Sequence, residues 1–244
     1  MPENLLVVIA TYNERENLPD LVSQIESLLP AADVLVIDDN SPDGTGQWCD
    51  ERKQSDSHLE VIHRSGKLGL GSATVTGFKY ALKHAAGYQL VATMDADFSH
   101  DPTSLVDLVS FLENDSAKEF GMCIGSRYVS GGRIENWPFA RRLSSKAVNL
   151  WTRLCCGVKI RDNSGAFRVY RRETLAQIGV DNIASSSYAY LEEIIWRASR
   201  GGIRIKELPI VFRDREQGQS KTSLKLGVSV FWHLLKIRLG RVKL

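Results

Sequence analysis

The 244-residue sequence contains only four cysteines, and none of them stands in a CxxC spacing. They are Cys49, Cys123 and the neighbouring pair Cys155 and Cys156. This arrangement does not resemble the disulfide framework of a secreted domain, so the sequence disfavours that class of protein. We expect reduced, mostly buried thiols in a cytosolic protein.

Long apolar runs are also absent. A membrane-spanning helix needs about 18 or more apolar residues, whereas the best candidate, residues 226–235, is bounded by Lys225 and Lys236. No basic and apolar leader precedes the first predicted strand, so we expect neither a spanning helix nor a cleaved signal peptide. Because repeats and low-complexity linkers are missing too, we predict a catalytic domain over residues 1–220 and a tail over residues 221–244.

Acidic and basic residues are unevenly divided along the chain. Residues 1–120 hold 20 acidic and 8 basic residues, whereas residues 121–244 hold 9 acidic and 23 basic ones. The two halves therefore carry −12 and +14, although the whole chain has a formal charge of only +2. Solvated surface is one explanation. The other is an acidic half that holds a cation and a basic half that binds an anionic partner.

Short apolar runs alternate with amphipathic stretches through the first half of the chain. This alternation predicts an α/β fold with a mainly parallel central sheet and helices on both faces, in which ligands bind at the carboxyl ends of the strands. The second half is less regular. The predicted strands or extended segments are 5–10, 34–38, 59–63, 90–94, 122–126, 166–170 and 203–209, and the predicted helices are 17–29, 72–86, 102–112, 142–156, 188–200 and 223–239.

Acidic residues directly follow two of these predicted strands. Asp38 and Asp39 open the segment Asp-Asp-Asn-Ser-Pro-Asp-Gly-Thr, and Asp95 and Asp97 flank Ala96. In extended geometry, residues spaced i, i+2 lie on one side, and their like charges repel unless a cation or a donor relieves them. We therefore predict a Mg²⁺ or Mn²⁺ site, because such an ion takes one or two carboxylates plus substrate phosphates.

Other loops carry weaker signals. Tyr12 could stack on a nucleobase, and Glu14 could accept a hydrogen bond from a base or a ribose. Asp43 and Asp101 are also explained as caps of the helices that follow them. The glycine-rich loop 66–71 matches neither the Walker pattern nor G-x-G-x-x-G, so a mononucleotide kinase and a dinucleotide dehydrogenase are disfavoured.

The order of the motifs resembles one known family. The segments that carry the resemblance are Thr11-Tyr12-Asn13-Glu14, Asp38 to Thr45, Lys67-Leu68-Gly69-Leu70-Gly71, Met94-Asp95-Ala96-Asp97, Gly125-Ser126-Arg127-Tyr128, Glu135-Asn136-Trp137-Pro138, Ser164 to Arg168 and Phe212 to Lys221. They cover nearly the whole chain and are similar to those of the dolichol phosphate mannosyltransferases, which are inverting family 2 glycosyltransferases with the GT-A (Rossmann-like) fold. The resemblance implies transfer of mannose from GDP-mannose to dolichyl or polyprenyl phosphate with Mg²⁺ or Mn²⁺ as cofactor.

On the donor side, the resemblance implies that Asp97 is the principal metal ligand, with Ser99 as a second metal position that is glutamine in some relatives. Ala10 stands where proline is usual, and residues 185–187 read Ser-Ser-Ser where relatives have Ser-Lys-Gly. The missing lysine leaves UDP-glucose or another sugar nucleotide open as the donor. The residues that the resemblance assigns to donor binding are Thr11, Tyr12, Glu14, Ile37, Asp39, Asp95, Ala96, Asp97, Arg215 and Lys221.

On the acceptor side, the resemblance assigns Arg127, Arg141 and Ser145 to the lipid phosphate and makes Asp97, Arg127 and Arg141 the catalytic residues. A phosphate monoester is already largely anionic near neutral pH, because its second pKa is about 6. The acceptor thus needs positioning more than deprotonation, and a planar guanidinium can position phosphate in a bidentate way. We expect no dedicated base and an in-line displacement that gives a β-linked product from an α-linked donor.

The tail is basic and amphipathic. After Glu216 there is no acidic residue, but there are six basic ones among aromatic and aliphatic side chains. Such a C-terminal helix either lies in a membrane interface or packs on the catalytic core. We expect peripheral attachment to the cytoplasmic face of a membrane and no nucleic-acid partner. Many relatives add transmembrane helices here or recruit a membrane partner subunit, so the need for a partner stays open.

Two functions from other classes also fit part of the pattern. A nucleotidyltransferase could use strand-end carboxylates and a metal, but it would release pyrophosphate, whereas a sugar transferase releases a nucleoside diphosphate. A non-catalytic nucleotide-sugar sensor is disfavoured by the combination of Asp95, Asp97 and Arg127.

Overall fold

The computed structural model describes residues 4–84, 87–214 and 224–242, with only the backbone described for residues 224–226. Its elements alternate between strands and helices, as the sequence predicts for the first half of the chain. In chain order they are β1 (Leu5–Thr11), α1 (Leu18–Leu28), β2 (Ala32–Asp38), α2 (Thr45–Lys53), β3 (Leu59–His63), α3 (Leu70–Lys83), β4 (Leu90–Asp95), α4 (Pro102–Asn114), β5 (Phe120–Ser126), β6 (Arg133–Glu135), α5 (Phe139–Cys156), β7 (Arg168–Arg171), α6 (Arg172–Gln177), a 3₁₀ turn (Val180–Asn182), α7 (Tyr190–Arg200), β8 (Arg204–Pro209), β9 (Val211–Arg213) and α8 (Leu224–Arg238).

Seven of the strands form one sheet in the order β3-β2-β1-β4-β7-β5-β8. Strand β7 runs antiparallel to both β4 and β5, whereas the other neighbouring strands pair in parallel. The predicted mainly parallel sheet is therefore confirmed. Strand order reverses between β1 and β4, and in doubly wound sheets this switch point is where ligands bind, at the carboxyl ends of the strands.

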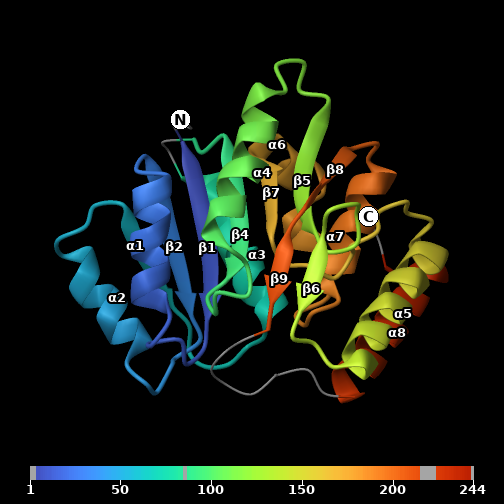
Figure 1. Cartoon of the computed structure of the whole chain (residues 1–244), viewed down its shortest axis with the longest axis horizontal. Helices are drawn as coiled ribbons and strands as arrows, with labels where there is room; N and C mark the ends of the chain where they lie inside the picture. The colour runs from blue at the N-terminus through green and yellow to red at the C-terminus, as the bar shows by residue number, and fades with distance from the viewer. Residues whose placement is uncertain (1–3, 85–86, 215–223, 243–244) are drawn as a thin grey trace.

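Each face of the sheet has its own hydrophobic core, because successive side chains of a strand point to opposite faces. Leu5, Val7 and Ile9 pack on one face with residues of α1 and α4. Leu6 and Val8 pack on the other face with residues of α3 and α7. Figure 1 views the molecule from the side of α1 and α4, with the second layer of helices behind the sheet.

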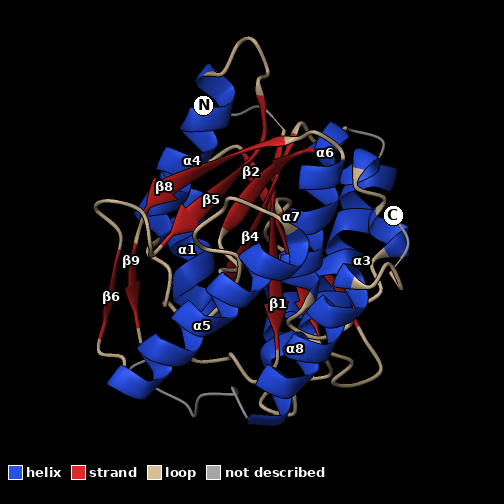
Figure 2. Cartoon of the chain, turned by 90° about the vertical axis from the view of Figure 1, so that its right-hand side faces the viewer, coloured by secondary structure: helices blue, strands red, loops and turns tan. Residues whose placement is uncertain are grey.

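The C-terminal helix α8 packs against α5 and α7. Its buried residues Val230, Leu234 and Ile237 belong to the core that also contains Cys155 and Cys156 of α5. Helices α5 and α8 lie beside each other at one end of the molecule (Figures 1 and 2). Within the described ranges, no helix combines the length and the apolar character needed to cross a membrane.

Several elements differ from the sequence-based prediction. Helix α2 was not predicted, because the segment Thr45–Lys53 is mostly polar and has no apolar stripe. Helix α5 begins at Phe139 rather than at residue 142, directly after Pro138. Strands β6 and β9 have three residues each and form a separate parallel pair, which no local pattern indicates.

Candidate active site

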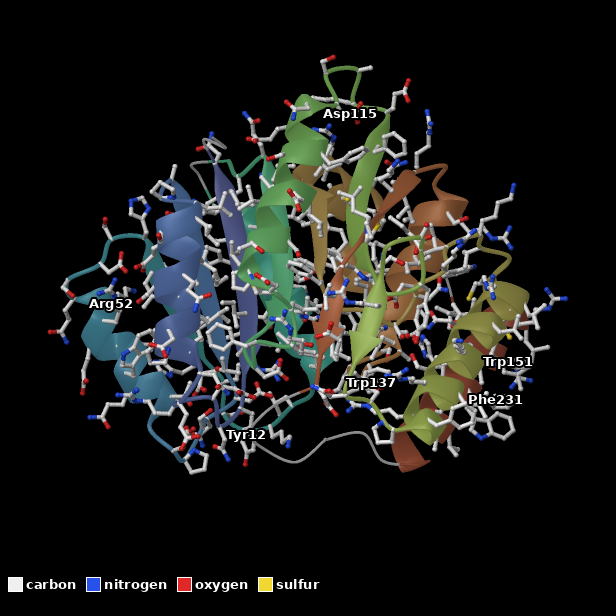
Figure 3. The ribbon with its side chains drawn as sticks, viewed as in Figure 1. Tyr12, Arg52, Asp115, Trp137, Trp151 and Phe231 are labelled. Carbon is white, nitrogen blue, oxygen red and sulfur yellow. The ribbon has the colours of Figure 1, made fainter. Side chains whose placement is uncertain are left out.

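The loops that follow β1, β2, β3 and β4 meet at one edge of the sheet. In Figure 3, Tyr12 and Trp137 lie at this edge, and Asp115 lies at the opposite one. Asp38 holds the first two loops in shape: its carboxylate accepts hydrogen bonds from the Thr11 hydroxyl at 3.0 Å and from the N–H and hydroxyl of Ser41. The backbone N–H of Asn13 in turn donates to the Ser41 hydroxyl at 3.0 Å. The loops after β1 and β2 are thus one connected structure.

The predicted donor residues Thr11, Tyr12, Glu14, Ile37 and Asp39 all lie in or beside this connected structure. The Thr11 hydroxyl also donates to the carbonyl oxygen of Ile37 at 3.5 Å. The Lys67 ammonium lies 4.3 Å from the centre of the Tyr12 ring, and Glu14 is buried. Sequence reasoning therefore identified a set of residues that the fold brings together.

Two aspartates of these loops lie at the start of a helix, but only Asp101 is an N-cap; the N-cap of α2 is Gly44, so the capping interpretation is confirmed for Asp101 alone. Asp43 accepts hydrogen bonds from the N–H and the hydroxyl of Thr45, at the start of α2. Although burial is the largest single influence and raises the pKa of Asp43, its hydrogen bonds outweigh burial and leave that pKa lowered. Asp101 caps α4 by accepting from the Thr103 N–H at 2.9 Å.

Asp39 is already engaged by groups of the protein itself. Its two carboxylate oxygens accept hydrogen bonds from Nε of Arg64 and from the Leu68 N–H at 3.1 Å. Arg64 also donates to the Ser72 hydroxyl at 2.8 Å and to the Gly69 carbonyl at 3.3 Å. Arg64 was missed by sequence reasoning, although it stands directly after the strand predicted at 59–63. Through Arg64, Asp39 fastens the glycine-rich loop to the end of β2.

The predicted metal position lies after β4. Ser99 donates its backbone N–H to the Asp97 carboxylate at 3.0 Å, and Phe98 between them has a φ of 57°. The buried Ser99 hydroxyl has no hydrogen-bond partner among the described residues. Carboxylate and hydroxyl oxygens of Asp95, Asp97 and Ser99 are the hard ligands that Mg²⁺ and Mn²⁺ prefer. Among the residues that the structure describes, no group of three or more His, Cys, Asp or Glu side chains could hold a metal ion.

His100 is a buried neighbour of this position that sequence reasoning did not select. Its ring stacks on Phe167 with a centroid separation of 4.9 Å, and its Nδ1 lies 3.9 Å from the Asp95 carboxylate. Burial lowers the pKa of His100 to about 4, more than the nearby Asp97 charge raises it. The imidazole is therefore neutral at pH 7 and adds no positive charge beside the carboxylates.

Among the predicted acceptor residues, Arg127 is almost completely buried and is held by Asp162. The Asp162 carboxylate accepts from Nε of Arg127 at 2.7 Å, from Nη2 at 2.6 Å and from the backbone N–H at 2.9 Å. Burial is the largest single influence and lowers the pKa of Arg127, but the charge and hydrogen bonds of Asp162, together with nearby Tyr128 and Asp95, leave that pKa raised. Asp162 shows the converse: burial raises its pKa, the Arg127 charge lowers it, and the net direction is downward. Both groups thus stay ionised as a pair.

Arg141 and Ser145 lie near Arg127, so the structure brings the predicted acceptor residues together. The guanidinium of Arg141 stands 4.1 Å from the centre of the Trp137 indole, and that of Arg127 stands 5.5 Å from it on the same ring. Ser145 accepts a hydrogen bond from the Tyr128 hydroxyl at 2.7 Å. Arg141 also pairs with Asp214 at 2.7 Å. Asp162 and Asp214 were both missed, since neither has a local signal that links it to an arginine.

Strand β9 connects the predicted metal position to the acceptor residues. The Arg213 N–H donates to the Ser99 carbonyl at 3.2 Å, and Phe212 forms an isolated bridge with His100. The Phe212 ring packs edge-on against Trp137, with centroids 5.3 Å apart. The predicted donor residues Arg215 and Lys221 follow β9 and lie outside the described residues.

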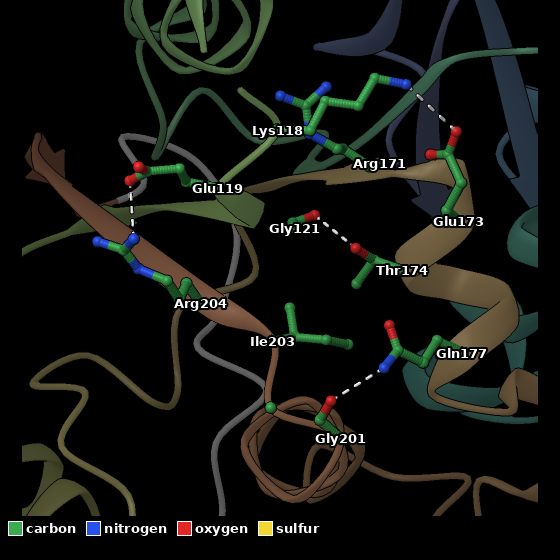
Figure 4. A pocket seen from close by; sticks show the side chains of 11 residues that line it. Lys118, Glu119, Gly121, Arg171, Glu173, Thr174, Gln177, Gly201, Ile203 and Arg204 are labelled. Atoms are coloured by element: carbon green, nitrogen blue, oxygen red, sulfur yellow. Dashed lines mark hydrogen bonds and ion pairs between the residues drawn. The ribbon is translucent and has the colours of Figure 1, made fainter. Parts of the chain in front are cut away.

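A separate cleft of about 310 Å³ lies beyond the amino end of β5 and is not part of this site. Its polar side chains contact one another, as Figure 4 shows for the Arg204–Glu119 and Lys118–Glu173 pairs and for the hydrogen bond from Thr174 to the Gly121 carbonyl. The candidate active site therefore remains at the carboxyl edge of the sheet, where the loops with acidic residues face the arginines.

This combination defines a class: the chain is a glycosyltransferase with the GT-A fold, in which acidic residues at the strand ends stand beside an arginine-lined second site. Residues 6–179 match the model of the family described as glycosyl transferase family 2, and the chain belongs to that family. The predicted family and fold are confirmed.

Relatives with similar sequences carry related names. The chain is 39% identical to an undecaprenyl-phosphate mannosyltransferase of Micrococcus luteus over 97% of this chain and 99% of that protein. It is 41% identical to a polyprenol monophosphomannose synthase of Mycolicibacterium smegmatis over 91% of this chain and 82% of that protein. It is 35% identical to a dolichol-phosphate mannosyltransferase of Pyrococcus furiosus, covering 95% of this chain but only 62% of that protein.

Solved structures share the fold at low sequence identity. A glucosyl-3-phosphoglycerate synthase of Mycobacterium tuberculosis in complex with Mn²⁺, uridine diphosphate and glucosyl-3-phosphoglycerate has a TM-score of 0.69 at 17% identity, over 98% of this chain and 80% of that one. A mannosyltransferase of Pyrobaculum calidifontis in complex with GDP-Man and Mn²⁺ has a TM-score of 0.55 at 18% identity, over 98% of this chain and 61% of that one.

Proposed function

We propose that this chain transfers mannose from GDP-mannose to a polyprenyl phosphate, with inversion, to give a polyprenyl phosphate β-mannose and GDP. The names of the three relatives support mannose as the sugar and a polyprenyl phosphate as the acceptor. The GDP-Man and Mn²⁺ bound by one structural neighbour support the donor and the use of a divalent cation.

The observation that carries the proposal is the two-sided character of helix α5. Arg141 and Ser145 stand one turn apart and face the site, whereas the opposite side of the helix exposes apolar residues. At roughly 100° per residue, Phe139, Leu143, Leu150 and Leu154 fall within an arc of about 60°. A phosphate-binding side and an apolar side on one helix suit an acceptor that has a phosphate head on a lipid chain.

The chain's own residues supply positioning and charge. Among the described residues, Nη1 of Arg127 has no hydrogen-bond partner, so this atom remains for an oxygen of the acceptor phosphate, while Asp162 fixes the plane of the guanidinium. Arg141 would bind a second oxygen, with Trp137 holding it in place. A divalent cation held by Asp97, Asp95 and Ser99 would neutralise charge on the leaving diphosphate. Asp39 and Tyr12 would bind the nucleoside, with Arg215 and Lys221 proposed at the donor phosphates.

The membrane surface in this proposal is formed by α5 and α8 together, not by the tail alone. Their exposed large apolar residues, called the α5–α8 apolar surface below, are Phe139, Leu143, Leu150, Leu154, Val228, Phe231, Trp232 and Leu239. Trp151 of α5 stacks on Phe231 of α8 with centroids 4.7 Å apart (Figure 3). Basic residues flank the surface, and such a pattern favours the interface of an anionic membrane. The surface would attach the protein peripherally, on the cytoplasmic face.

A donor and acceptor screen tests the reaction. GDP-mannose and UDP-glucose are offered separately, with and without undecaprenyl phosphate, in the presence of Mn²⁺, Mg²⁺ or a chelator. We expect a mannosylated lipid and GDP only when GDP-mannose, the lipid phosphate and a divalent cation are all present. Formation of a glucosylated lipid would refute GDP-mannose as the donor. Release of pyrophosphate would indicate a nucleotidyltransferase instead.

Vesicle flotation tests the membrane surface. Removing residues 220–244 would expose the core beneath Val230 and Leu234, so point substitutions are the cleaner test. The double variant Leu150→Glu, Trp232→Glu should lose binding to phosphatidylglycerol vesicles, whereas Lys146→Gln, on the same helix, should keep most of it. Equal flotation of both variants would refute the α5–α8 apolar surface as the contact.

A further inference from the structure

Glu193, on helix α7, joins three segments that are distant in sequence. Its fully buried carboxylate accepts hydrogen bonds from Nε of Arg197 at 3.0 Å and from the backbone N–H groups of Ala184 and Ser185. His233 of α8 also contacts it, with Nε2 at 2.9 Å. Burial, the largest influence, raises the pKa of Glu193, but the hydrogen bonds from His233, Ala184 and Arg197 outweigh it and leave the pKa lowered. Glu193 is therefore an ionised link between α8 and the loop 184–187.

The loop 184–187 lies directly on the glycine-rich loop at the start of α3. The Ser72 N–H donates to the Ser186 carbonyl at 3.3 Å. A Cβ atom added to Gly69 would stand 2.5 Å from the same carbonyl oxygen, and one added to Gly71 would stand 2.7 Å from the Ser187 carbonyl. No side chain fits between the two backbones, so the two loops are in direct backbone contact and neither can move toward the other without displacing it.

The glycine-rich loop is in turn fixed to the predicted donor residue Asp39. The Ser72 hydroxyl accepts from Arg64, and Arg64 and the Leu68 N–H both donate to the Asp39 carboxylate. Hydrogen bonds thus join His233 to Glu193 and Glu193 to the backbone of Ala184 and Ser185. The chain continues from Ser185 to Ser186, whose carbonyl accepts from Ser72, and Arg64 then links Ser72 to Asp39. One end of this series is on a helix of the α5–α8 apolar surface, and the other is at the proposed donor site.

We infer that His233 and Glu193 are positioning residues that couple attachment of α8 at a membrane to the affinity of the donor site. This inference rests on the proposed function, which supplies both the membrane and the nucleotide. Attachment at the exposed face of α8 fixes where the helix lies. Because His233 on α8 is hydrogen-bonded to Glu193, and Glu193 to the backbone of the loop 184–187, a shift of α8 also shifts this loop. The coupling restricts tight donor binding to protein that has already reached its lipid acceptor.

The test measures binding of GDP with Mn²⁺ by calorimetry, with and without phosphatidylglycerol vesicles that contain no acceptor. For the unmodified protein, we expect vesicles to tighten GDP binding about three- to tenfold. His233→Leu removes the hydrogen bond to Glu193 and should abolish this effect, although flotation shows equal attachment. His233→Gln places a side-chain N–H donor on the same helix and should restore at least half of the effect. In the transfer assay, His233→Leu should raise the donor KM and leave the acceptor KM unchanged.

A double-mutant cycle then separates coupling from local damage. If the two ends communicate, the effects of His233→Leu and Ser72→Ala on GDP affinity will be non-additive by about threefold or more. Additive effects, or a vesicle response in His233→Leu equal to that of the unmodified protein, would overturn the coupling. Binding of UDP in place of GDP would refute the proposed donor alone, and the same comparison made with UDP would then decide the coupling.

Discussion

The proposed donor side and the proposed acceptor side of the site hold their charged groups in different ways. On the proposed donor side, Asp38 and Asp97 accept hydrogen bonds from neutral N–H and hydroxyl groups, whereas Asp39 is paired with an arginine, Arg64. On the acceptor side, each arginine has a carboxylate partner, Asp162 for Arg127 and Asp214 for Arg141. Neutral partners leave the negative charge in place for a cation, whereas a carboxylate offsets much of the positive charge that a phosphate would otherwise meet. Asp97 thus accepts from a neutral N–H group, whereas Asp39 and the two proposed acceptor arginines share their charge with oppositely charged side chains of the fold.

The largest expected effect is on stability, and it compares the buried Arg127–Asp162 pair with the partly exposed Arg141–Asp214 pair. Asp162→Asn leaves the Arg127 charge buried without its partner and should lower the free energy of unfolding by about 3–5 kcal/mol. Asp214→Asn breaks a pair whose side chains are more than a quarter exposed and should cost at most about 1 kcal/mol. Urea unfolding of both variants measures the difference. Losses of equal size would mean that Arg127 does not depend on Asp162 for its stability.

The next effect concerns activity. Asp97→Asn keeps the shape of the side chain but removes the charge that would hold a cation at the leaving diphosphate, and it should lower kcat by about 10²–10³-fold. Asp101→Asn is the matched control: it lies four residues away, caps α4, and should retain near-normal kcat because Asn is also a good cap. Both rates are measured at saturating donor and acceptor over a range of Mn²⁺ concentrations. If Asp97→Asn kept normal activity, the proposal that Asp97 is the metal ligand would be refuted.

The parts of the molecule that follow from local sequence patterns were predictable. Apolar runs gave the strands of the parallel sheet, and Asp101 before Pro102 gave the start of α4. The strand ends then located Asp39, Asp95 and Asp97, because parallel strands all present their carboxyl ends at one edge.

The partners of these residues could not be predicted in the same way. Asp162 lies 35 residues from Arg127, and Arg64 lies 25 residues from Asp39, so each pair forms only when the chain folds. Arg168 is fully buried and donates to three backbone carbonyl groups, and nothing in its local sequence indicates this burial. Burial of a charged residue depends on carbonyl groups that no side-chain pattern reveals.

Glu192 provides a comparison with its paired neighbour Glu193. Burial raises the pKa of Glu192 to about 7. Among the described residues, one of its buried carboxylate oxygens also has no hydrogen-bond partner. Between the ordinary value of 4.5 and about 7, the folded protein binds this proton more tightly than the unfolded chain does, so the contribution of Glu192 to stability falls as the pH rises through that window.

Glu192→Gln should remove this pH dependence. Relative to the unmodified protein, the variant should gain on the order of 2 kcal/mol at pH 8 and almost nothing at pH 4.5, as measured by urea unfolding at both values. Glu193→Gln is the opposite control and should lose stability at pH 8, because its carboxylate is paired with Arg197 and His233. If Glu192→Gln raised the free energy of unfolding by the same amount at both pH values, ionisation of Glu192 would not be the cause of the lost stability.

The smallest expected effect tests whether the acceptor arginines still serve a substrate while they are paired. Arg141 is partly exposed, so Arg141→Ala should leave the free energy of unfolding within about 1 kcal/mol of normal. If Arg141 binds the acceptor phosphate, the acceptor KM should rise about tenfold, which corresponds to about 1.4 kcal/mol, while the donor KM stays constant. Arg142→Ala is the matched control, because Arg142 is the next residue of α5 but donates to the Ile134 carbonyl. If both variants raise the acceptor KM equally, the effect comes from the general charge of α5 and not from a phosphate site at Arg141. If Arg141→Ala has a normal acceptor KM, Asp214 already takes all of its charge and the acceptor phosphate binds elsewhere.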